Sequence, residues 1–138
     1  MPIASKTWDE LARQALAVRR RAYAPYSRFK VGAALLGGDP PRVITGCNVE
    51  NSSYGLTVCA ERVAIGRAIA EGVREFSALA IASQGTEPAP PCGMCLQTLL
   101  EFCEDLELLL VSSSGTRRRT RLSRLIPRPV RFPRAGRR

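Results

Sequence analysis

Three cysteines in two short stretches have the residue type and spacing of metal ligands. Cys59 opens the stretch Cys-Ala-Glu, and Cys92 and Cys95 form a C-x-x-C pair that begins 33 residues later. Three thiolates fill three positions of a tetrahedral zinc ion and leave the fourth open, which is typical of catalytic zinc sites. A lone C-x-x-C pair would more often be a redox pair or two small buried side chains. The combination of both stretches predicts a catalytic zinc centre.

Glu61 has the chemistry that such a centre needs beside its ligands. It follows Cys59 by two residues, so on a helix its carboxylate points about 200° away from the thiolate and is not expected to bind the same ion. We expect it to move protons on a water molecule that zinc activates. Arg62 and two helix N-termini would offset the negative charge of three thiolates.

Several stretches of the chain, taken together, resemble a known family. The likeness runs in order through residues 25–36 (PYSRFKVGAALL), 46–51 (GCNVEN), 54–65, 80–83 and 91–102, within a span from residue 8 to about 112. Zinc deaminases share the signature of a metal ligand, any residue and Glu, followed by Pro-Cys-x-x-Cys. The sequence resembles the small zinc-dependent cytidine deaminases.

The resemblance implies a fold and a reaction. The fold would be α/β, a three-layer α/β/α deaminase fold with a mixed five-stranded sheet. The reaction would be hydrolytic deamination of cytidine and deoxycytidine to uridine and deoxyuridine, a step of pyrimidine salvage, with one Zn²⁺ per chain. The partners implied are a nucleoside substrate and three further copies of the chain in a homotetramer.

The resemblance also assigns roles to individual residues. Asn48 and Glu50 would hydrogen-bond the ribose hydroxyls, although in a loop these residue types more often face solvent. Phe29 would pack against the base and the backbone of Ala60 would orient it. Tyr54, also expected to bind substrate, and the end of the chain resemble segments that reach into the site of a neighbouring subunit in the tetrameric members.

Two positions depart from the pattern of the family. An arginine commonly follows the second cysteine of Pro-Cys-x-x-Cys and offsets thiolate charge, but this chain has Leu96 there. Loss of such a group typically costs roughly 10- to 100-fold in metal affinity or activity. Phe132 lies further past Leu125-Ile126-Pro127 than the family's terminal aromatic residue, so its assignment stays open.

Length and composition indicate the number of domains, the cellular location and the state of the cysteines. The length of 138 residues suits one domain over residues 1–138, with a basic, proline-containing tail from about residue 123. No run of about 18 apolar residues and no signal peptide is visible, so we expect a cytoplasmic protein without membrane contact. Five cysteines without framework-like spacing fit reduced thiols or metal ligands.

The net charge of +9 comes from the end of the chain. Ten arginines and no acidic residue lie between residues 117 and 138, which leaves 11 basic and 12 acidic residues elsewhere. Arginines on an edge strand discourage pairing with the sheet of another molecule. We therefore prefer this structural role to nucleic-acid binding.

Hydrophobic periodicity and turn residues predict eight elements. Thr7 to Glu10 has the form of a capping box, and a turn cluster at residues 37–41 joins two strands. The expected elements are a helix at 8–22, strands at 29–36 and 43–47, a helix at 59–71, a strand at 78–82, a helix from about 92 to 103, and strands at 106–111 and 116–122. Residues 48–58 should be a loop that carries side chains toward the zinc, and the chain from residue 127 should be irregular.

Three other functions fit parts of the pattern. A deaminase of the same fold could act on another aminated base or nucleoside, such as a nucleoside antibiotic. An editing deaminase or binder of nucleic acid would use the arginine-rich tail, and its affinity would fall steeply with salt. A purely structural zinc protein would show no turnover at all.

Overall fold

A computed structural model of the chain describes residues 2–133, and the predicted order of eight elements is confirmed. Two short helices, η1 and α4, add to the prediction. The elements are α1 (Ser5–Arg19), β1 (Val31–Gly37), β2 (Arg42–Cys47), the 3₁₀ helix η1 (Tyr54–Leu56), α2 (Ala60–Ala70), β3 (Phe76–Ser83), α3 (Gly93–Phe102), β4 (Glu107–Ser112), β5 (Arg117–Arg121) and α4 (Leu122–Leu125).

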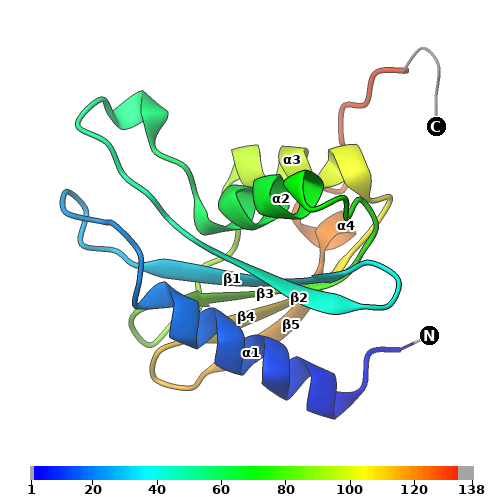
Figure 1. Cartoon of the computed structure of the whole chain (residues 1–138), viewed down its shortest axis with the longest axis horizontal. Coiled ribbons are helices and arrows are strands. Elements are labelled where there is room, and N and C mark those ends of the chain that lie inside the picture. The colour runs from blue at the N-terminus through cyan, green and yellow to red at the C-terminus, as the bar shows by residue number, and fades with distance from the viewer. Residues whose placement is uncertain (1, 134–138) are drawn as a thin grey trace.

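The strands form one mixed sheet in the order β2-β1-β3-β4-β5. Strand β1 pairs antiparallel with β2 and β3, β3 runs parallel to β4, and β4 pairs antiparallel with β5. Helix α1 covers one face of this sheet, while α2 and α3 lie side by side on the other (Figure 1). The expected three-layer α/β/α fold with a mixed five-stranded sheet is thus confirmed.

Small residues bring α1 close to the sheet. Its buried face packs against alanines of β1 and β3, and a Cβ atom at Gly32 would stand 2.1 Å from the carbonyl oxygen of Ala15. Only glycine fits that position. The α1 face consists of Trp8, Leu11, Ala12 and Ala15.

The boundaries of α1 differ from the prediction. The helix begins at Ser5, and the carbonyl of Ala4 accepts hydrogen bonds from Thr7 and Trp8, so the predicted capping box at Thr7 is wrong. No side chain caps this end, and Ser5 and Lys6 are exposed, so their free N–H groups are accessible to solvent. At the other end, regular helix stops at Arg19, and tighter i to i+3 bonds carry the turn on to Ala22.

Strand β5 forms the edge of the sheet, as the arginine pattern predicts. Arg117 pairs with Asp9 and Arg119 lies 4.2 Å from the ring centre of Trp8, so both extend toward α1 and share one face. Helix α4 follows directly and buries Leu122; its four residues are too few to show a period in the sequence. Residues 127–133 contain no helix or strand, as expected, and Arg134, Arg137 and Arg138 lie outside the described residues. Between residues 2 and 133, no helix is both long and apolar enough to cross a membrane.

Candidate active site

The three predicted ligands come together at the N-termini of two neighbouring helices. Cys59 is the N-cap residue of α2, Cys92 is that of α3, and Cys95 lies in the first turn of α3. Their sulfur atoms all lie within 4.8 Å of one another, with 3.9 Å between Cys59 and Cys92 and 3.5 Å between Cys92 and Cys95. The sulfur cluster thus joins segments 33 residues apart in sequence.

This cluster fits a zinc ion. A tetrahedral ion with zinc–sulfur bonds of about 2.3 Å would hold its sulfur ligands about 3.8 Å apart. The observed separations bracket that value, and no rearrangement of the two helices is needed. Helix N-termini favour anionic sulfur, because free N–H groups and the helix dipole place positive charge there.

Arg62 supplies the positive charge beside the sulfur cluster. Its guanidinium Nη2 lies 3.7 Å from the sulfur of Cys59 and 3.3 Å from the carbonyl oxygen of Thr57, to which it donates. A hydrogen bond from Cys95 and the contact with Arg62 lower the pKa of Cys59 to about 5. The pKa of Cys95 is raised, mainly because its thiol donates to Cys59. This environment therefore favours the thiolate form of Cys59.

Leu96 does not contribute charge to the cluster. Its side chain is 8% exposed and belongs to the hydrophobic core between the sheet and helices α2 and α3. The missing arginine of the family pattern is therefore not replaced at this position. The compensation expected from Arg62 is consistent with its contact to Cys59.

Glu61 is buried beside the cluster, in the first turn of α2. The residue is 4% exposed, and burial raises its pKa to about 7, with a smaller contribution in the same direction from the charge of Cys59. A buried carboxyl group near neutrality can exchange protons at physiological pH. Ala60 precedes it as the first residue of α2 and is fully buried.

Asn48 is buried and holds the start of β1. Its side-chain oxygen accepts the N–H of Val31 at 2.8 Å, and its side-chain nitrogen donates to the carbonyl of Phe29 at 2.9 Å. Asn48 is 8% exposed, so it is not the solvated loop residue that its type would suggest. Phe29 itself is 38% exposed at the end of the segment that Asn48 anchors.

Glu50 lines a small cavity of about 220 Å³. Tyr26, Ser27, Tyr54 and Thr57 form the rest of its wall, and the rings of Tyr26 and Tyr54 meet edge to face at 5.8 Å. Thr57 connects this cavity to the sulfur cluster, because its carbonyl accepts the Arg62 hydrogen bond. The loop between β2 and α2 that carries Glu50 and Tyr54 extends well beyond the sheet in Figure 1.

Tyr26, Ser27 and Thr57 line the cavity although the sequence did not predict them as site residues. The hydroxyl of Ser27 and the backbone N–H groups of Tyr26 and Ser27 all bind the Glu50 carboxylate. The Ser27 hydroxyl contributes most to the lowered pKa of Glu50. The signal was present in Pro-Tyr-Ser, within the first matching stretch, but a contact across 23 residues is not visible in the sequence.

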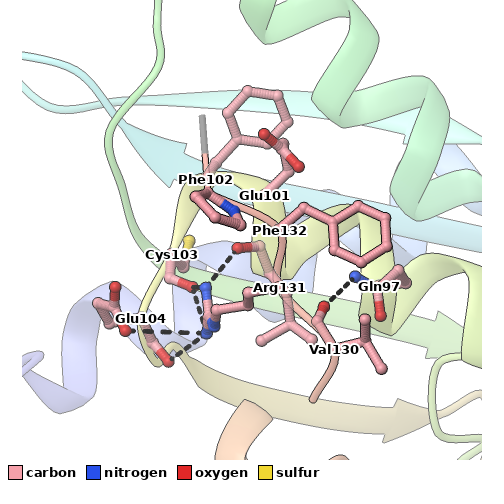
Figure 2. A pocket seen from close by; sticks show the side chains of 10 residues that line it. Gln97, Glu101, Phe102, Cys103, Glu104, Val130, Arg131 and Phe132 are labelled. Atoms are coloured by element: carbon pink, nitrogen blue, oxygen red, sulfur yellow. Dashed lines mark hydrogen bonds and ion pairs between the residues drawn. The ribbon is translucent and has the colours of Figure 1, made fainter. Parts of the chain in front are cut away.

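A larger cavity of about 420 Å³ lies elsewhere, between α3 and the chain around Arg131. Figure 2 shows that Arg131 reaches the carbonyl groups at the C-terminal end of α3, while Gln97 binds the carbonyl of Val130. None of the predicted catalytic, ligand or substrate-binding residues lines it. Phe132 does line it, but its side chain is 85% exposed, so the unassigned aromatic residue borders this cavity without being buried there.

The arginines of β5 do not form a free cationic surface. Arg117, Arg118, Arg119 and Arg121 each form an ion pair, with Asp9, Glu87, Glu107 and Asp105 respectively. A nucleic-acid surface needs cations that are available to phosphates. The ion pairs agree with the expected structural role of these arginines on an edge strand.

Known proteins resemble the chain over most of its length. A cytidine deaminase of Sporosarcina psychrophila is 42% identical over 120 residues, 86% of this chain and 88% of that protein. One from Halalkalibacterium halodurans is 46% identical over 118 residues, 85% of this chain and 89% of that protein. The crystal structure of a cytidine deaminase from Burkholderia pseudomallei matches with a TM-score of 0.82 and 43% identity, covering 91% of this chain and 98% of that one.

The family comparison agrees with the geometry of the sulfur cluster. Residues 5–108 match the family described as the cytidine and deoxycytidylate deaminase zinc-binding region. That span includes the three clustered cysteines, so the predicted zinc cofactor is confirmed, while the roles of individual residues stay predictions. The chain belongs to the cytidine and deoxycytidylate deaminase family.

Proposed function

We propose that the protein hydrolyses cytidine and deoxycytidine to uridine and deoxyuridine with release of ammonia. The observation that carries the proposal is a buried carboxyl group, Glu61, in the turn between Cys59 and the body of α2, beside a three-sulfur cluster that fits zinc. Family membership and relatives named cytidine deaminase support the same reaction.

Cys59, Cys92 and Cys95 would hold the metal, and Arg62 would offset their charge. A zinc ion bound there supplies the Lewis acidity that makes a water molecule nucleophilic at neutral pH. Glu61 would accept one proton from the water that attacks C4 and deliver it to ring nitrogen N3. It would then take the second proton from the hydroxyl now bonded to C4 and deliver it to the amine, so that the C4–N bond breaks, C4=O forms and ammonia leaves. Its burial keeps bulk water away from these transfers.

The nucleoside would be bound by residues of three segments. Asn48 and Glu50 accept or donate hydrogen bonds at the ribose hydroxyls, Phe29 packs against the base, and the backbone of Ala60 orients it. Glu50 and Tyr54 share the small cavity beside the sulfur cluster, and this supports a sugar-binding role there.

We further infer that the chain is a single domain that assembles as a homotetramer in the cytoplasm and serves pyrimidine salvage. Tyr54 is 74% exposed, and Leu56 and Met94 near the site are also largely exposed. Large apolar side chains gathered at a site are typical of surfaces that a second subunit covers. All five cysteines are unpaired, which suits a reducing compartment.

The test of this function is loss of ultraviolet absorbance by purified, zinc-quantified protein with cytidine, deoxycytidine and an aminated nucleoside antibiotic. Turnover of the first two is expected. Turnover of the antibiotic alone would favour a same-fold deaminase with another substrate. Salt-sensitive binding of oligonucleotides without turnover of any nucleoside would instead favour a protein that binds or edits nucleic acid.

A further inference from the structure

We propose that Ser27 is a positioning residue for the nucleoside sugar, because its hydroxyl fixes the Glu50 carboxylate in the orientation that accepts a sugar hydroxyl. The inference rests on the proposed function and adds a residue outside the set of expected substrate contacts. It concerns the segment between Tyr26 and Phe29, which forms part of the wall of the 220 Å³ cavity.

The segment before β1 donates three hydrogen bonds to Glu50. The backbone N–H groups of Tyr26 and Ser27 both donate to Oε1, at 2.9 and 3.1 Å, and the Ser27 hydroxyl donates to Oε2. An ionised carboxylate offers about four acceptor positions. Both positions on Oε1 and one on Oε2 are thus occupied, and one position on Oε2 stays available to a ligand.

A second hydrogen bond sets the direction of the Ser27 hydroxyl. The N–H of Phe29 donates to Ser27 Oγ at 3.0 Å, so the hydroxyl accepts from Phe29 and directs its own proton to Glu50. Without the hydroxyl, Oε2 would lose its only protein donor among residues 2–133, and the carboxylate could rotate about Oε1. Ser27 therefore selects which acceptor position faces the cavity.

The turn that places Ser27 has an unusual backbone. Arg28 has a φ of 59°, in the left-handed region that residues other than glycine seldom adopt. Hydrogen bonds on both sides hold this turn, from Arg28 N–H to the carbonyl of Ala24 and from Phe29 N–H to Ser27. Because Asn48 fixes the carbonyl of Phe29, the turn is tied to both expected sugar-binding residues.

A sugar hydroxyl is the ligand group that this geometry suits. The open position on Oε2 can only accept a hydrogen bond, and the neighbouring Tyr26 and Tyr54 rings offer apolar faces to a sugar. A carboxylate already oriented for the hydroxyl lowers the cost of ordering it on binding. The contribution of Ser27 should therefore appear in KM for a substrate with sugar hydroxyls.

The experiment compares Ser27→Ala with the unmodified zinc-loaded protein on cytidine and on 2′,3′-dideoxycytidine, which lacks both ring hydroxyls. KM for cytidine should rise about 5- to 10-fold, which is the effect expected from losing a partly exposed hydrogen bond to a charged carboxylate. The value of kcat should change less than about 2-fold. kcat/KM for the dideoxy nucleoside should not change. Ser27→Thr, which keeps the hydroxyl, should keep KM for cytidine within about 2-fold.

Two controls separate positioning from folding. Ser53→Ala removes an exposed hydroxyl that has no hydrogen-bond partner within residues 2–133, and it should leave both substrates unaffected. In a Glu50→Gln background, Ser27→Ala should have no further effect on KM, because the two residues act as one unit. If Ser27→Ala does not fold, Ser27→Cys, with its weak donor, replaces it under the same criteria.

Each result decides the inference. An unchanged KM for cytidine in Ser27→Ala, or an equal loss on both nucleosides, would overturn the role of Ser27 while leaving the proposed function intact. Absence of turnover of cytidine and deoxycytidine by the unmodified protein would refute the proposed function, and the inference with it.

Discussion

The backbone of Gly46 on β2 lies directly against the first turn of α2, where a Cβ atom would stand 2.6 Å from the carbonyl oxygen of Ala60. It would also stand 2.5 Å from the backbone nitrogen of Ala64. Both neighbours are helix backbone, so neither can move without the helix. The absence of a side chain at Gly46 therefore sets how closely Cys59 and Glu61 approach the sheet.

Gly46→Ala is expected to displace the start of α2. Overpacking of this kind costs about 1 to 3 kcal/mol of unfolding free energy, and displacement of Glu61 should lower kcat at least about 10-fold. Urea unfolding and cytidine turnover measure the two effects. The matched control is Gly66→Ala on the exposed side of α2, where a Cβ atom would meet nothing within 4 Å. This substitution should raise the unfolding free energy by up to about 1 kcal/mol, because alanine favours the helix more than glycine does. Equal stability and activity of the Gly46 variant would contradict the close approach.

Of the five cysteines, only the three in the sulfur cluster should determine the metal content. Cys92→Ser and Cys95→Ser are expected to reduce bound zinc from about one per chain to well below half, because each removes one of the three proposed ligands. Cys47→Ser, outside the cluster, should keep full occupancy. Elemental analysis after gel filtration gives the comparison, and loss of zinc in the Cys47 variant would argue against the assigned ligand set.

Arg131 is expected to stabilise the C-terminal end of α3. Its guanidinium donates to the carbonyl of Leu100, in the last turn of α3, which the helix leaves without an N–H partner. It also donates to the carbonyls of Cys103 and Glu104, which directly follow the helix (Figure 2). Arg131→Ala should therefore lower the unfolding free energy by about 1 to 2 kcal/mol. Arg128→Ala, which removes an exposed arginine of the same segment, is the control and should stay within about 0.5 kcal/mol. Equal unfolding curves for the two variants would exclude a capping role.

Asp105 should make stability depend on acid pH. Partial burial opposes its ionisation, but hydrogen bonds from the Ser123 backbone and the Arg121 side chain outweigh this and lower its pKa to about 2. A lowered pKa in the folded state gives stability that is complete above about pH 4 and disappears as the pH falls toward 2.

Asp105→Asn should therefore lower the free energy of unfolding by about 1 kcal/mol at pH 7, a modest loss because the carboxylate is partly exposed. The loss should become progressively smaller between pH 4 and 2. Thermal unfolding across this range measures the difference. Asp9→Asn, which removes only an exposed ion pair, should change stability by less than about 0.5 kcal/mol. If the loss of unfolding free energy in Asp105→Asn does not change with pH, it comes from packing and not from the charge of Asp105, which would contradict this prediction.

The fold was largely predictable because its periodic patterns are local. Turn residues and apolar runs located all eight main elements, and the arginines of β5 correctly indicated an edge strand. The boundaries of α1 were not predictable in the same way. The sequence allows two starts for this helix, one at a capping box on Thr7 and one at Ser5 without a side-chain cap. Residue types alone do not show which start the helix adopts.

The site was predictable only where its residues are close in sequence. The Cys59 and C-x-x-C stretches each indicate their predicted ligands, and the packing of α2 beside α3 brings the three sulfur atoms together. Asn48 and Ser27 depend instead on pairing of the segment before β1 with the loop after β2. Such contacts arise from tertiary packing, so neither the burial of Asn48 nor the contact of Ser27 with Glu50 could be read from residue types.

The central claim, that Glu61 moves protons beside a three-cysteine zinc site, is tested most directly with Glu61→Gln. The substitution keeps size and hydrogen-bonding capacity but removes the exchangeable carboxyl proton. At equal zinc content and equal thermal stability, we expect kcat for cytidine to fall by at least about 100-fold. Turnover within a few-fold of that of the unmodified protein would contradict the role of Glu61 and the mechanism built on it.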